Sequence, residues 1–151
     1  MTEQNWLKYA AIALGAVGFL AIIGLALNYG DGLEGRTWVV QEMSVDGTMT
    51  APIPQATPYA VFENGSIGGS ASCNTYNGGY EAGRGSITIG PLITTLMFCQ
   101  EPQGTMDQEA AYLSLLESAD SFSVDGDVLV LSNGDTPLIR YNVAEVVHQS
   151  G

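Results

Sequence analysis

Two short runs of sequence hold the residues best able to do chemistry. Residues 69–80 read Gly-Ser-Ala-Ser-Cys-Asn-Thr-Tyr-Asn-Gly-Gly-Tyr, which predicts a strand of small side chains running into a polar, glycine-rich turn. Amide, hydroxyl and phenol groups in such a turn can bind a sugar or a peptide. The candidate residues of a ligand-binding turn are Asn74, Tyr76, Asn77, Gly78 and Tyr80. Tight turns also require Asn and Gly for backbone reasons, and buried Tyr hydroxyls usually bond to the backbone, so we favour a structural role.

The second run, residues 94–99, reads Thr-Thr-Leu-Met-Phe-Cys and predicts a buried strand over residues 92–99. Each run contains one of the two cysteines, Cys73 and Cys99. In an exported domain, two cysteines predict one disulfide. It would close a loop of 99 − 73 = 26 residues, for which chain entropy gives a stabilisation of about 3.5 kcal/mol. The alternative is a pair of inert buried thiols in a domain that faces the cytoplasm.

The residue types needed for catalysis are not arranged in any recognisable pattern. A serine or cysteine nucleophile needs a rigid base beside it, and the one histidine, His148, is three residues from the C-terminus. Nothing in the spacing of the carboxylates selects a pair for acid–base work. A structural zinc site is not expected either, because the sequence has no second pair of cysteines to complete its ligands. We therefore expect a protein that is not an enzyme, without a metal, cofactor or known small-molecule ligand.

The charge balance excludes one class of partner. The chain has 16 acidic residues against 4 Lys and Arg. Removing Glu3 and Lys8 leaves 16 − 1 = 15 acids and 4 − 1 = 3 bases, so the remainder keeps the whole net charge of −12. A negative field of this kind repels phosphate backbones and anionic headgroups. Nucleic-acid binding is therefore not expected.

An apolar block near the start predicts a membrane anchor. Residues 9–27 contain neither a charge nor an amide side chain, and a helix of that length covers about 28 Å, close to the hydrocarbon thickness of a bilayer. Trp6, Tyr9 and Tyr29 stand at its two ends, where aromatic rings favour the headgroup region. We expect a cytoplasmic N-terminus at residues 1–8, a transmembrane helix at residues 9–28 and a linker at residues 29–35, with the soluble domain periplasmic or extracellular.

Two alternatives for this block remain. A cleaved signal peptide would use residues 24–26, Gly-Leu-Ala, as its small-x-small cleavage site. A buried soluble helix would be amphipathic, whereas this block is apolar on every side. We favour a permanent span, which makes the membrane a partner through residues 9–28.

The elements that must position residues 69–80 and 94–99 are predicted to be mostly short strands. Strand-forming segments flank the turn pairs Asp46-Gly47, Asn64-Gly65, Asp125-Gly126 and Asn133-Gly134. Strands joined by tight turns pair antiparallel. The predicted fold class is mainly β (α+β): a curved antiparallel sheet or partly open barrel with one packed helix, preceded by the N-terminal transmembrane helix.

The single soluble helix is predicted at residues 104–119. Thr105 and Gln108 match a capping box at its start. Helical spacing predicts a buried face made of Met106, Ala110, Leu113 and Leu116, with Asp107, Glu109 and Glu117 away from that face.

The sequence resembles the META domain family, which includes HslJ-like heat-shock proteins. The resemblance rests on residues 58–62, 69–80, 94–99, 106–113 and 125–129 and covers about residues 33–143. It implies that residues 36–144 form a compact β-rich domain that contains one helix, and that residues 145–151 form a tail. It also implies an exported or membrane-bound protein. It supplies no catalytic residues. It favours a role in envelope stress tolerance or in interaction with envelope proteins; the alternative is a small-ligand or glycan-binding module that uses the turn at Asn74–Tyr80. Ser72 stands where the family usually has glycine.

Overall fold

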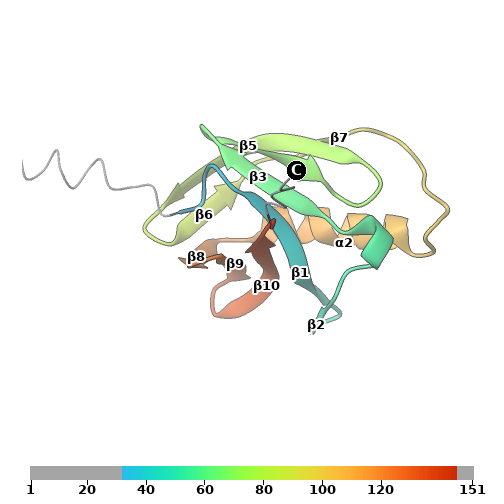
Figure 1. Cartoon of the computed structure of the whole chain (residues 1–151). Helices are drawn as coiled ribbons and strands as arrows, with labels where there is room; N and C mark the ends of the chain where they lie inside the picture. The colour runs from blue at the N-terminus through green and yellow to red at the C-terminus, as the bar shows by residue number, and fades with distance from the viewer. Residues whose placement is uncertain (1–31, 146–151) are drawn as a thin grey trace, which may run out of the picture. The chain divides into compact units, whose positions relative to one another are not determined.

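The computed structural model describes residues 32–145 (Figure 1). The expected N-terminus at 1–8, the span at 9–28, the first part of the linker and the tail beyond residue 145 lie outside the described residues. The strands are β1 (Thr37–Val45), β2 (Thr48–Thr50), β3 (Tyr59–Glu63), β4 (Ser66–Ser70), β5 (Thr75–Gly83), β6 (Ser86–Ile89), β7 (Ile93–Thr94), β8 (Ser121–Asp125), β9 (Val128–Asn133) and β10 (Thr136–Val143). A 3₁₀ helix, η1 (Pro54–Ala56), precedes β3, and an α-helix, α2 (Thr105–Ser118), precedes β8.

Eight of the strands form a closed antiparallel barrel. Their order around the barrel is β1, β3, β4, β5, β6, β8, β9 and β10, and β10 pairs with β1 to close the ring. The seam between β6 and β8 is the narrowest, with Ser86 and Ser121 as its paired residues. β2 extends the edge of β1, and β7 pairs with the first half of β5. The prediction of a mainly β fold with one packed helix is confirmed, and the barrel closes.

The hairpin turns follow from local sequence. Asn64 and Gly65 have φ angles of 50° and 78°, both left-handed, as a two-residue turn of this kind requires. The Asp46-Gly47 turn has the same form, with φ angles of 50° and 79°. These predicted turns therefore set the register of β1 with β2 and of β3 with β4.

The core fills the barrel, and α2 packs against β1, β6 and β10 (Figure 1). Tyr112 and Leu116 of α2 are fully buried in this core. The largest buried side chains of the strands are Trp38, Phe62, Met43, Ile67, Leu129, Leu131, Ile139 and Tyr141. Among the residues described, no helix has the length and apolar character to cross a bilayer.

The start and the buried face of α2 differ from the prediction. No capping box forms: Gly104 is the N-cap residue, and the Thr105 hydroxyl donates to the carbonyl of Pro102 at 2.6 Å. Gln108 instead donates its amide N–H groups to Ala56 and Ser72, both at 2.8 Å. These neighbouring segments offer bonds that compete with capping.

The buried residues of α2 are Thr105, Glu109, Tyr112 and Leu116. Of the predicted face, Leu116 is buried and Leu113 packs against the core while partly exposed. Ala110, predicted to be buried, is exposed. The physical reason is that the turn and loop packed beside this helix present hydrogen-bond donors, which favour a buried carboxylate over an apolar side chain.

The backbone conformations of residues 69–80 and 92–99 also differ from the prediction. Residues 74–80 are not a turn, because β5 begins at Thr75; the chain reverses just before it, where the Ala71 N–H donates to the Asn74 carbonyl at 2.8 Å. Residues 92–99 are not a buried strand. Only Ile93 and Thr94 pair with β5, and residues 95–98 form an exposed loop. The prediction of a buried strand over residues 92–99 is therefore wrong.

Candidate functional site

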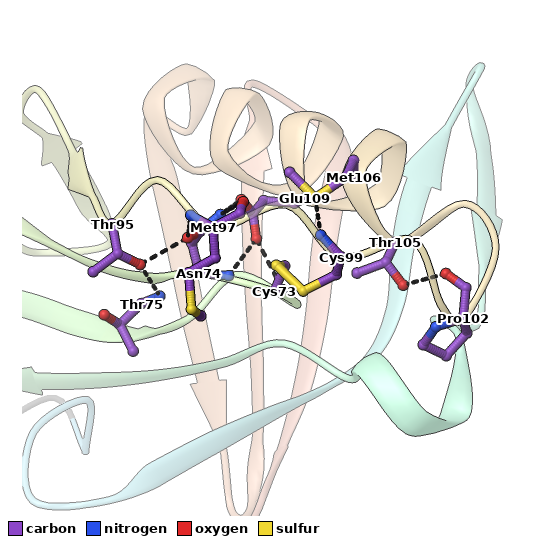
Figure 2. Close-up of a disulfide and its surroundings, with 10 residues drawn as sticks. All are labelled: Cys73, Asn74, Thr75, Thr95, Met97, Cys99, Pro102, Thr105, Met106 and Glu109. Carbon is purple, nitrogen blue, oxygen red and sulfur yellow. Dashed lines mark hydrogen bonds between the residues drawn. A yellow bond between two sulfur atoms is a disulfide. The ribbon is translucent and has the colours of Figure 1, made fainter.

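The centre of the site is the buried side chain of Asn74, which is 3% exposed. Its Oδ1 accepts hydrogen bonds from the Met97 N–H at 2.7 Å and from the Thr95 hydroxyl at 2.8 Å. Its Nδ2 donates to the Met97 carbonyl at 3.0 Å. Figure 2 shows these contacts joining the end of the 71–74 turn to the loop that follows β7. Asn74 therefore replaces a strand partner for the backbone of that loop.

Glu109 of α2 supports the same turn and is 5% exposed. One carboxylate oxygen accepts from the backbone N–H groups of Cys73 at 2.9 Å and Asn74 at 2.7 Å. The other accepts from Asn74 Nδ2 at 2.6 Å. Three donors compensate the buried carboxylate for its lost water. Glu109 was not a predicted site residue, and its helical spacing gives no signal that it would be buried.

A covalent link lies beside this network. Cys73 and Cys99 form a disulfide, with their Cα atoms 5.9 Å apart (Figure 2). The Cys99 N–H also points at the Met106 sulfur of α2, 3.5 Å away. Turn, loop and helix are thus joined by one covalent bond and a set of buried hydrogen bonds. We call Cys73, Asn74, Cys99 and Glu109 the anchor cluster.

The anchor cluster holds a loop that presents apolar side chains to solvent. We call residues 93–98 the apolar loop. Leu96 is 96% exposed and Phe98 is 75% exposed, and Ile93 and Met97 are also exposed. The loop backbone is held further by the Thr95 N–H, which donates to the Thr75 carbonyl at 3.1 Å. Exposed apolar groups on a fixed backbone are typical of an interaction surface.

Most of the predicted ligand residues have internal roles. The Tyr76 hydroxyl donates to the Tyr59 carbonyl at 3.1 Å and lies 3.0 Å from the Tyr112 hydroxyl. Tyr112 in turn lies 3.1 Å from the Tyr141 hydroxyl. We call Tyr76, Tyr112 and Tyr141 the tyrosine cluster. Burial raises the pKa of each of its three phenols well above 10.0.

Tyr80 and Gly78 are also used inside the domain. Tyr80 is buried against Phe62 and donates its hydroxyl to Glu34; burial, and then this hydrogen bond, raise its pKa. A Cβ at Gly78 would lie 2.8 Å from the Leu92 side chain, so glycine allows the close approach of that segment. Of the five candidates, Asn77 alone faces outward from the barrel wall.

Asn77 belongs to a groove on the outer wall of β3, β4, β5 and β7. The cross-strand row Val61, Gly68, Asn77 and Ile93 runs over this wall, and its members face solvent while the adjacent row is turned inward. Because Gly68 lacks a side chain, the wall is hollowed there into a groove of about 520 Å³, bordered by Tyr59, Val61 and Asn77. Ile93, the first residue of the apolar loop, pairs with Asn77 and so lies beside this groove.

Charges are scarce around both features. Residues 65–80 and 85–100 contain no charged side chain, although the protein is strongly acidic. Within residues 32–145, no three His, Cys, Asp or Glu side chains gather in a group that could hold a metal ion. The apolar loop is therefore an uncharged contact surface, and Glu63 is the one charged residue that lines the groove.

The fold and the site define a small disulfide-linked β-barrel with one packed helix and an exposed apolar loop. The model of the META domain family matches residues 31–145. The chain therefore belongs to the META domain family. No curated protein matches the sequence.

Several solved structures resemble this chain. An NMR structure of a protein from Burkholderia xenovorans has a TM-score of 0.62 and 22% identity, covering 78% of this chain and 90% of that one. A second NMR structure has a TM-score of 0.58 and 22% identity, covering 78% and 97%. A crystal structure of a DUF4847 family protein from Bacteroides vulgatus has a TM-score of 0.51 and 16% identity, covering 73% and 93%. At these identities the likeness concerns the fold alone.

Proposed function

We propose that this chain is a non-enzymatic, protein-binding META domain, held outside the cytoplasm by a membrane span at residues 9–28, that acts in envelope stress tolerance. The observation that carries the binding role is the apolar loop. Leu96 and Phe98 are exposed although the neighbouring backbone is fixed by buried bonds and a disulfide. A loop fixed in this way loses little conformational freedom on binding, which favours affinity.

The disulfide supports the proposed compartment. Disulfides persist in the periplasm and outside the cell, whereas the cytosol keeps thiols reduced. Labelling with a membrane-impermeant maleimide tests this in intact cells. We expect Cys73 and Cys99 to be labelled only after an impermeant reductant has been added, without cell lysis. Labelling without reductant, or only after lysis, would contradict the proposed bond or compartment.

Photo-crosslinking in cells tests the binding role. A photoreactive phenylalanine at position 96 should yield discrete adducts with another polypeptide, because Leu96 is almost fully exposed on the apolar loop. The same group at Val45, an exposed apolar residue of β1, is the matched control and should give few adducts. Equal adducts at both positions would show that the apolar loop is not a special surface.

The stress role has its own test. Replacing Leu96 and Phe98 together by serine removes the exposed apolar groups without touching the anchor cluster. Cells carrying this variant should lose tolerance to heat or envelope stress while the protein level stays unchanged. Normal growth of these cells under stress would refute the role.

The outer-wall groove favours a second candidate, a small-ligand or glycan-binding module. An outward amide at Asn77 beside the ring of Tyr59 offers hydrogen bonds and a flat apolar surface to a sugar. A glycan panel followed by thermal shift tests it: specific stabilisation should disappear in Asn77→Ala. Without any stabilising glycan, this candidate is rejected.

A further inference from the structure

The surface charge limits how two copies of this domain can meet. The chain carries a net charge of −12, so most orientations of two copies bring like charges together. Near the apolar loop, the outer wall of β3, β4, β5 and β7 differs from the rest of the surface because it carries few charges. Its paired residues Tyr59, Ser70 and Thr75 are uncharged, as is the row from Val61 to Ile93. Glu63, at the end of β3, is the one charged residue that lines the groove, and Glu81 lies farther along β5.

This surface contains a projecting part and a hollow part side by side. The projecting part is the apolar loop, and the hollow is the groove at Gly68. Gly68 pairs with Asn77, and Asn77 pairs with Ile93. Two strand spacings therefore separate Gly68 from Ile93, a distance of about 10 Å. In Figure 1 the strands β3, β5 and β7 that carry these features lie along one side of the barrel.

A surface with adjoining projection and hollow can complement itself. In a two-fold arrangement the same patch is used by both subunits, so each projection meets the other subunit's hollow. An axis passing close to Ile93 and Asn77 would place each apolar loop in the groove of the opposite copy. It would bury Leu96 and Phe98 twice, once from each subunit, with Glu63 as the one charged residue along each groove.

We propose that a second copy of this chain docks on this surface, with the apolar loop of each copy packed in the outer-wall groove of the other. The inference rests on the proposed binding role of the apolar loop and names the partner. The anchor cluster fixes the loop before association, and the open groove needs no rearrangement to receive it.

Crosslinking between isotopically distinct chains tests this arrangement. Full-length chains, one population with natural nitrogen and one with ¹⁵N, are mixed in a neutral detergent with a photoreactive phenylalanine at position 98. We expect adducts that join a light chain to a heavy chain, from position 98 to the segment between Glu42 and Glu81 that contains the groove. Adducts within single chains only, adducts that map elsewhere, or no adducts would overturn the proposal.

A charge placed at the centre of the surface gives an independent measurement. Ile93→Glu sets two carboxylates against each other across the axis, and like charges in an interface are unfavourable. We expect the dimer dissociation constant in sedimentation to rise at least about tenfold, which corresponds to about 1.4 kcal/mol. Val45→Glu makes the same change on an exposed apolar residue outside the surface and should alter the constant less than about twofold.

The outcomes separate this inference from the proposed function. Equal effects of Ile93→Glu and Val45→Glu, or a full-length chain that stays monomeric, refute docking of a second copy. If position 96 then still captures a different protein in cells, the protein-binding role stands with another partner. If neither assay yields adducts, both proposals fail.

Discussion

Replacing Glu109 by glutamine tests whether the anchor cluster supports the apolar loop. The substitution keeps the shape of the side chain but turns one carboxylate oxygen into an NH₂ group. The oxygen that serves the N–H groups of Cys73 and Asn74 can be retained. The new NH₂ group must then face Asn74 Nδ2, another donor, across what is now a 2.6 Å hydrogen bond. One bond is lost and two buried donors oppose each other.

The expected loss of stability follows from that count. A hydrogen bond to a charged group contributes about 1.5–3 kcal/mol, and an unsatisfied buried donor costs about 1–3 kcal/mol. We therefore expect Glu109→Gln to lower the free energy of unfolding by about 2–4 kcal/mol. With a urea dependence of about 1.5 kcal/mol per M, the midpoint of unfolding moves down by about 2 M.

Urea unfolding of the full chain in a neutral detergent measures this change. The fluorescence of buried Trp38 reports the fold, provided that Trp6 is replaced by phenylalanine in every variant. Asp107→Asn is the matched control: Asp107 lies exposed in the first turn of the same helix. This substitution removes a negative charge and with it only a favourable interaction with the helix dipole, which contributes at most about 1 kcal/mol.

Equal midpoints for Glu109→Gln and Asp107→Asn would refute the role given to Glu109. The buried carboxylate would then be no more than a surface-like charge. Hydrogen exchange adds a local measurement. In Glu109→Gln the Met97 N–H, held by Asn74, should exchange faster, because the side chain that accepts its hydrogen bond has lost its support from α2.

Three further outcomes are expected. The raised pKa values of the tyrosine cluster mean that the folded state favours neutral phenols. The stability that these tyrosines contribute is complete below about pH 10 and falls at higher pH, because the tyrosines then ionise in the unfolded chain. The loss is up to about 1.4 kcal/mol per pH unit for each tyrosine. The pKa of Tyr80 is raised as well, so four tyrosines contribute to this slope, and thermal melts between about pH 9 and 12 should show it reduced by roughly a quarter in Tyr141→Phe; an unchanged slope would count against the cluster. Replacing both cysteines by serine opens a 26-residue loop and should remove about 3.5 kcal/mol in urea unfolding, whereas an unaltered midpoint would mean that the disulfide adds no stability. Gly69→Ala would push a Cβ into the Tyr59 carbonyl oxygen and should cost about 2–3 kcal/mol; Gly83→Ala, with open space around it, should stay within about 1 kcal/mol, and similar values for both would contradict the close approach.

The strands and their turns could be read from short stretches of sequence. Asn64-Gly65 encodes a left-handed turn in two adjacent residues, so the hairpin of β3 and β4 needs no distant information. The disulfide likewise follows from the count of cysteines together with the expected compartment. The site could not be read in this way. Glu109 lies 35 residues from Asn74, and nothing near it in sequence distinguishes it from an exposed helical acid such as Asp107.

Local sequence is enough to predict which runs form strands, where the chain turns, and where the helix lies. Each of these depends on backbone preferences and on periodicity within a few residues. Which polar groups are buried and which apolar groups are exposed depends instead on the folded arrangement. Asn74 takes the place of a strand partner for Met97, so residues 95–98 leave the sheet and Leu96 turns to solvent. The physical reason is that burial depends on the partners that folding brings together, and those partners lie far apart along the chain.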